Sequence, residues 1–187
     1  MSQAVKVARW TSSVAAVLGM LAAVQPAAAQ TSKERYVANF ERMRLNVLAM
    51  VDSMPAAGLR TAPTEGVRDF AEQIEHVALG NVNLIASGID ADRIPLGLEK
   101  EVYLNDKEEL KRLVNVAFDR VREMLNAMSP EDLLAEGRLF GQVPLPKWQI
   151  VEAAYEHGLW TLGATVPYVR LQGGVPHSYG IVPRGQM

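Results

Sequence analysis

Apolar residues recur at intervals of three and four positions in four separate segments of this 187-residue chain. This spacing places them on one face of a helix, and such a face must be buried against other helices. The segments cover about 33–53, 69–88, 105–125 and 146–171. We find no sustained alternation of apolar and polar residues and no Asn-Gly turn, so the sequence indicates no strand pair. The pattern predicts an all-α fold, a four-helix bundle.

Local signals mark several helix ends. Asp69 and Glu72 stand three residues apart, as the two partners of a capping box do, so the second helix should begin there. Pro55 should end the first helix, because the residue before a proline is pushed out of the helical region. Pro167, with Gly163, should kink the last helix.

The segment from Ile89 to Leu104 has no clear periodicity and is the longest connection in the chain. A connection of this length can cross the end of a bundle. We therefore expect a long link between the second and third helices, which then need not be antiparallel neighbours.

The N-terminal residues 1–29 have the composition of a signal peptide. Lys6 and Arg9 form a basic start, and Val14–Val24 is an apolar run shorter than the ~20 residues that a membrane span needs. Ala27–Ala29 then supplies the small-residue pattern of a cleavage site. The sequence therefore predicts an exported protein, periplasmic or secreted.

Cleavage before Gln30 would leave residues 30–187 as one domain with no membrane span. It removes two of the 19 basic residues and none of the 21 acidic ones, so the formal net charge becomes −4. An acidic chain lacks the basic face that nucleic acids require. Because there is no cysteine, disulfides, thiolate metal sites and a cysteine nucleophile are excluded.

Three stretches together resemble the DinB/YfiT-like superfamily. "GVRDFAEQIEHVA" (66–78) resembles its second-helix motif, and "EHGLWTLGATVPYVRLQGGVPHSYG" (156–180) resembles its fourth-helix signature. "VANFERMRLNVLAMVDSMPAAGL" (37–59) resembles its first helix. The resemblance covers nearly all of the predicted domain. It implies a four-helix bundle of DinB/YfiT type, often a homodimer, with a divalent metal held by three histidines.

The resemblance places His76 and His157 at two of the three metal-ligand positions. The third position, one helical turn after His157, is Thr161, a poor ligand for zinc, nickel or copper. One ligand of a structural zinc site contributes roughly 3 kcal/mol, so its loss weakens binding by about a hundredfold. We therefore expect zinc or nickel to be bound weakly or not at all.

Other side chains are candidates for an additional ligand or for the pocket. Glu72 lies one turn before His76 and could bind the ion or orient the imidazole, or it could simply close the capping box. His177 could fold back from the glycine-containing tail. The resemblance also retains Tyr168 and Arg170.

Two classes of function remain open from the sequence. The resemblance implies a metal-dependent hydrolase or transferase, in which a metal-bound water is the reactive group. The alternative is a non-catalytic periplasmic bundle that binds a small apolar ligand or a protein partner. The chain contains no Ser-His-Asp signature, no phosphate-binding loop and no general base besides His157, which favours the alternative slightly. Trp160 is expected in the core or in a dimer contact.

Overall fold

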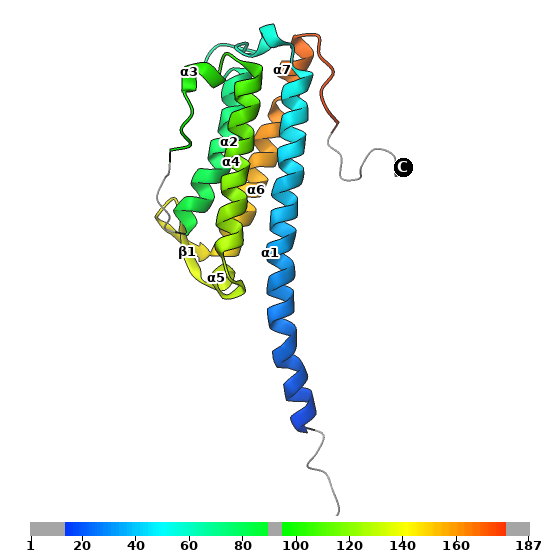
Figure 1. The fold of residues 1–187 in the computed structure, drawn as a ribbon, viewed down its shortest axis with the longest axis vertical. Helices are drawn as coiled ribbons and strands as arrows, with labels where there is room; N and C mark the ends of the chain where they lie inside the picture. Colours follow the sequence, from blue (N-terminus) through cyan, green and yellow to red (C-terminus); the bar gives the residue numbers. More distant parts are fainter. Residues whose placement is uncertain (1–13, 90–94, 179–187) are drawn as a thin grey trace, which may run out of the picture.

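A computed structural model describes residues 14–89 and 95–178 of the chain. Four long helices lie side by side: α1 (Val14–Ser53), α2 (Phe70–Gly88), α4 (Lys107–Ala127) and α6 (Lys147–Ala164) (Figure 1). The shorter elements join them: η1 (Ala56–Gly58), α3 (Lys100–Tyr103), α5 (Pro130–Leu134), β1 (Glu136–Leu139), β2 (Val143–Pro146) and α7 (Val166–Leu171). The predicted four-helix bundle is confirmed.

Helices α2 and α4 run in the same direction, so they are parallel neighbours. Both begin at the end of the bundle where α1 finishes: the Ala71 N–H donates to the Leu59 carbonyl at 2.9 Å, and Lys107 Nζ donates to the Met54 carbonyl at 2.8 Å. The connection that carries α3 returns the chain along the bundle to that end (Figure 1). The predicted long link therefore allows helices two and three to be parallel.

A single apolar core lies between the four helices, on the faces that the helical spacing predicts. Phe70, Ile74 and Ile85 of α2 are completely buried. The other contributions to the core come from all three partner helices: Phe40, Met43, Val47 and Val51 of α1; Leu110, Leu113, Val121 and Leu125 of α4; and Ile150, Val151 and Ala154 of α6.

Helix α1 begins at Val14 and therefore includes part of the segment predicted to be a signal peptide. Cleavage before Gln30 stays a prediction. Among residues 14–89 and 95–178, no helix combines the length and the apolar character needed to cross a membrane.

The start of α2 is fixed by the capping box that the sequence predicts. The Glu72 N–H donates to Asp69 Oδ1 at 2.9 Å, and the Asp69 N–H donates to Glu72 Oε2 at 3.0 Å. Arg60 adds an ion pair to the same carboxylate, with Nε 2.6 Å from Asp69 Oδ2. Asp69 is buried, and both the capping box and the ion pair with Arg60 hold it at the start of α2.

The predicted kink in the last helix is present as a break. Helix α6 ends at Ala164, Thr165 separates it from α7, and Pro167 lies in the first turn of α7. Tyr168 in α7 is buried against the bundle, and its ring lies 6.5 Å from that of Phe70 at the start of α2.

One prediction was wrong, because the chain contains a strand pair. β1 and β2 form an antiparallel hairpin in which Leu139 pairs with Val143. The turn uses Phe140 and Gly141 at positive φ (54° and 72°), in place of an Asn-Gly turn. Gly137 is the one buried residue of the four in β1. Strands this short with a single buried position leave no alternation to detect.

Candidate functional site

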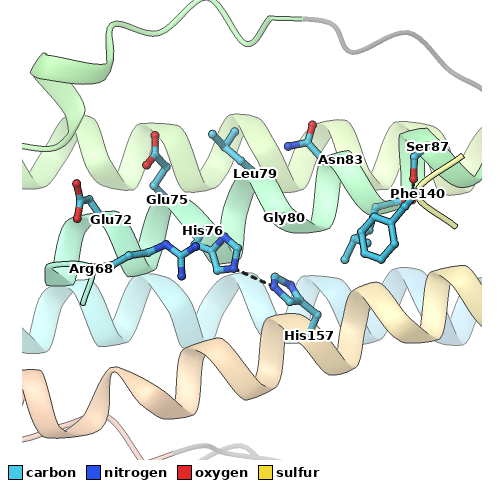
Figure 2. A pocket seen from close by; sticks show the side chains of 11 residues that line it. Arg68, Glu72, Glu75, His76, Leu79, Gly80, Asn83, Ser87, Phe140 and His157 are labelled. Carbon is cyan, nitrogen blue, oxygen red and sulfur yellow. Dashed lines mark hydrogen bonds between the residues drawn. The ribbon is translucent and has the colours of Figure 1, made fainter. Parts of the chain in front are cut away.

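His76 of α2 and His157 of α6 face each other across the bundle (Figure 2). Their Nε2 atoms are 3.1 Å apart, and the rings meet edge to face with centroids 4.8 Å apart. In such a contact one imidazole donates an N–H and the other accepts it, so the accepting ring is neutral. The expectation that the two histidines lie close together is confirmed, while their role as metal ligands stays a prediction.

Two glycines let the backbones of α2 and α6 approach closely enough for this contact. A Cβ at Gly80 would stand 2.6 Å from His157 Cε1. A Cβ at Gly158 would stand 2.6 Å from Met43 Sδ and 3.0 Å from Asn81 Oδ1. A Cβ atom essentially never lies 2.6 Å from a neighbouring side-chain atom, so a side chain at either glycine would force its neighbours to move.

Burial lowers the pKa of both His76 and His157, because it disfavours the charged imidazolium. The guanidinium of Arg68 lowers both pKa values further, and His157 lowers that of His76 through the repulsion between two like charges. The pair is therefore predominantly neutral at pH 7.

The pair fits a divalent metal ion in its spacing but not in its surroundings. Two imidazole nitrogens on one tetrahedral zinc ion lie about 3.3 Å apart. A catalytic zinc, however, takes three protein ligands, and no group of three or more His, Asp or Glu side chains suited to an ion occurs in the described part of the chain. His157 Nδ1 is buried without a hydrogen-bond partner there, whereas a metal-bound histidine normally donates its second N–H. Within residues 14–89 and 95–178, the pair therefore has no third His, Asp or Glu ligand arranged beside it.

Glu72 and Glu75, the two carboxylates that line the same pocket as the pair, already have partners. Glu72 belongs to the capping box. Glu75 accepts the Tyr103 hydroxyl at 2.6 Å and Lys100 Nζ at 3.0 Å. These bonds hold both carboxylates in their present positions.

A cavity of about 550 Å³ opens beside the histidines, along the surface of α2. Arg68 and Glu72 lie at one end of it and Phe140, from the hairpin, at the other (Figure 2). Between these ends the cavity is lined by Glu75, His76, Leu79, Gly80, Asn83, Leu84, Ser87 and His157. This size is ordinary for a small-molecule site.

The other candidate residues have different positions. Thr161 is buried and does not line the cavity. The Tyr168 hydroxyl donates to the Arg68 carbonyl at 3.0 Å and accepts from Gln73 Nε2 at 3.1 Å, so Tyr168 supports one end of the cavity without lining it. Arg170 is exposed and does not line it either.

His177 does fold back, but not to the histidine pair. Its Nε2 lies 3.2 Å from Asn46 Oδ1 of α1, where both residues line a separate cavity of about 300 Å³. Met50 and Leu162 also border that cavity.

Of the eleven residues that line the cavity, sequence reasoning assigned Glu72, His76 and His157. It assigned none of the others, including Gly80, Arg68 and Phe140. Gly80 lies one turn after His76 on the same helix face, so the spacing could have drawn attention to it. Arg68 stands inside the second-helix motif but was assigned no role. No feature of the sequence placed Phe140 near the site, because the hairpin that carries it was not predicted.

Comparisons with known proteins agree with this architecture. The model of the DinB superfamily matches residues 39–160. Among solved structures, a DinB-like protein from Bacillus cereus superposes with a TM-score of 0.63 at 16% identity, covering 78% of this chain and 95% of that one. A DinB-like protein from Bacillus subtilis gives a TM-score of 0.61 at 18% identity, covering 78% and 97%. A search of curated proteins finds no match.

Proposed function

This chain belongs to the DinB superfamily, and we propose that it is a non-catalytic member that binds a small molecule in the cavity beside His76 and His157. One observation carries the proposal. The two histidines at the family's metal-ligand positions contact each other through their Nε2 atoms, on the wall of a cavity of about 550 Å³. Thr161, which stands where the family pattern has the third histidine, also supports the proposal.

We propose further that the histidine pair binds zinc or nickel only weakly. Thr161 offers a neutral hydroxyl where the family pattern has an imidazole, and Glu72 is held in the capping box. With about 3 kcal/mol per ligand, a two-histidine site is roughly a hundredfold weaker than the three-histidine site.

Calorimetric titration with zinc at a single pH tests this proposal. We expect weak binding or none by the wild-type protein. Thr161→His restores an i, i+4 histidine pair on α6 and should tighten binding by about a hundredfold. Thr161→Gln is the control, since it adds a side chain of similar size without an imidazole, and it should not tighten binding. Tight binding by the wild type would mean that another ligand completes the site. An unchanged affinity in Thr161→His would mean that this position does not face the pair.

A metal-dependent hydrolase or transferase is the second candidate. The observation that favours it is the 3.1 Å separation of the two Nε2 atoms, which is close to the spacing that one shared ion requires. A bound ion would supply Lewis-acid chemistry and an activated water. The same zinc titration separates the two candidates, because tight wild-type binding is required by this one only.

We also propose that the protein is exported, periplasmic or secreted, and forms a homodimer. The basic start, short apolar run and Ala27–Ala29 support cleavage before Gln30. Trp160 is 85% exposed on α6, which suits a contact between two copies. We expect the intact mass of the exported protein to begin at Gln30, and light scattering to give the mass of two chains. An intact mass that retains residues 1–29 would contradict export with cleavage before Gln30. A light-scattering mass of one chain at micromolar concentration would contradict the homodimer.

A further inference from the structure

We infer that the cavity holds an elongated organic anion, with its carboxylate on Arg68 and its apolar chain running along α2 to Phe140. The inference rests on the proposed ligand-binding function and adds the chemical class of the ligand. It draws on the charge at one end of the cavity, on the shape of the cavity, and on the residue at the other end.

Arg68 is the cation of the cavity wall, and its guanidinium forms no ion pair within residues 14–89 and 95–178. Its backbone is held in place, because the buried Tyr168 donates its hydroxyl to the Arg68 carbonyl. A fixed backbone with a free guanidinium suits a carboxylate, since the planar fork of arginine can donate two parallel N–H bonds to it.

The two acidic residues of the wall do not cancel this charge. Glu75 is neutralised by Lys100, whose Nζ is 3.0 Å away, and receives the Tyr103 hydroxyl as well. Glu72 accepts the Asp69 N–H and has Arg60 Nη2 at 3.9 Å. Both carboxylates have cationic partners that do not line the cavity, so Arg68 remains as the positive charge available to a ligand.

The shape of the cavity calls for a long ligand. Its lining follows α2 from Glu72 to Ser87, which spans about 22 Å of helix at ~1.5 Å per residue. Leu79 and Leu84 make the middle of this path apolar, and Gly80 adds no side chain to it (Figure 2). An extended hydrocarbon chain matches such a surface better than a compact polar molecule.

Phe140 lies at the end of the cavity opposite Arg68, and both its backbone conformation and its exposure are unfavourable. Its φ of 54° lies in the left-handed region, where a bulky side chain is strained, and the residue is 69% exposed. A residue whose backbone is strained and whose ring is exposed contributes little to the stability of the fold. Contact with the apolar end of a ligand would give it a role, because that contact removes apolar surface from water.

The test compares ligands of one chain length and different head groups. Decanoate, decanol and decyltrimethylammonium are titrated into the protein by calorimetry, each below its micelle concentration. We expect decanoate to bind at least tenfold more tightly than the other two. Arg68→Gln should lower the decanoate affinity to that of decanol and leave decanol unchanged. Arg170→Gln is the matched control, since Arg170 is exposed and outside the cavity, and it should change neither affinity.

The outcomes separate this inference from the function on which it rests. If decanol binds as tightly as decanoate, or Arg68→Gln leaves decanoate unaffected, the anion inference is wrong while ligand binding stands. If none of the three probes binds at the highest concentration at which it stays dissolved as single molecules, ligand binding in this cavity is itself contradicted.

Phe140→Gly provides an independent arm of the test. Glycine adopts positive φ without strain, so this variant should be more stable to urea than the wild type. It should nevertheless bind tetradecanoate, whose longer chain can reach the ring from Arg68, several-fold more weakly, because the apolar chain loses its contact with the ring. A purely structural role for Phe140 would not weaken binding, so an unchanged tetradecanoate affinity would overturn the placement of the chain against this ring.

Discussion

At the scale of single residues, the site depends on the absence of a side chain as much as on the two imidazoles. Gly80 lies directly against His157, and its missing Cβ leaves the room that the His157 ring occupies. His76 and His157 could be assigned from the sequence because the family's motifs place them. Their direct contact could not be assigned, since it requires the distance between α2 and α6, which glycines on both helices set and which no helical periodicity encodes.

Gly80→Ala tests this dependence. The added methyl would stand 2.6 Å from His157 Cε1, so the ring must move, and we expect this to disturb the contact between the Nε2 atoms. We expect a loss of about 1–3 kcal/mol in the free energy of unfolding, measured by urea denaturation, because the site becomes overpacked. Gly163→Ala is the control: nothing lies within 4 Å of its added methyl, so the better helix propensity of alanine should stabilise the protein by up to about 1 kcal/mol. Equal effects of the two substitutions would contradict the close packing at Gly80.

At the scale of elements, the structure is most predictable where a local interaction decides it. The capping box at Asp69 and Glu72 is a contact between residues three positions apart, so the sequence alone sufficed to predict it. The break before Pro167 follows from the chemistry of proline in the same way. The hairpin has no such local code, because Phe140 occupies a turn position that glycine, asparagine or aspartate usually fills. Its position next to α2 and α6 therefore had to come from the structure.

Asp69→Ala measures how much the start of α2 contributes to stability. The substitution removes the side-chain cap and also the partner of Arg60, whose Nε lies 2.6 Å from Asp69 Oδ2. We expect a loss of about 1–2 kcal/mol in the free energy of unfolding by urea denaturation. Asp106→Ala is the matched comparison, since the Asp106 side chain caps α4 by accepting the Glu108 and Glu109 N–H groups without an arginine beside it, and it should cost less, about 0.5–1 kcal/mol. A smaller loss at Asp69 than at Asp106 would show that the ion pair with Arg60 adds nothing.

At the scale of the whole molecule, the direction of each helix decides which side chains can meet. Helices α2 and α6 run antiparallel, so the middle of one faces the middle of the other, and His76 meets His157 there (Figure 1). The sequence predicted the number of long helices and the long link that lets α2 and α4 be parallel. It could not predict the cavity, because its two ends come from segments 72 positions apart, Arg68 before α2 and Phe140 in the hairpin. The molecule therefore places a half-buried, neutral histidine pair in the interface between α2 and α6.

That placement predicts how the stability of the whole fold depends on pH. The folded-state pKa values of His76 and His157 are lowered, chiefly by burial and then by Arg68, while the unfolded chain titrates near the ordinary value of about 6.5. The unfolded state therefore binds more protons between these values, so stability is fully present above about pH 6.5 and is lost as pH falls toward the folded pKa values. Urea denaturation from pH 8 to pH 5.5, with a chelator present, should show this decline above the range in which carboxylates titrate. Replacing both His76 and His157 with glutamine should flatten the decline, whereas His177→Gln, which changes a residue beside the other cavity, should leave it in place. A decline that persists in the double variant would assign the pH dependence to other groups and contradict the lowered pKa values of the pair.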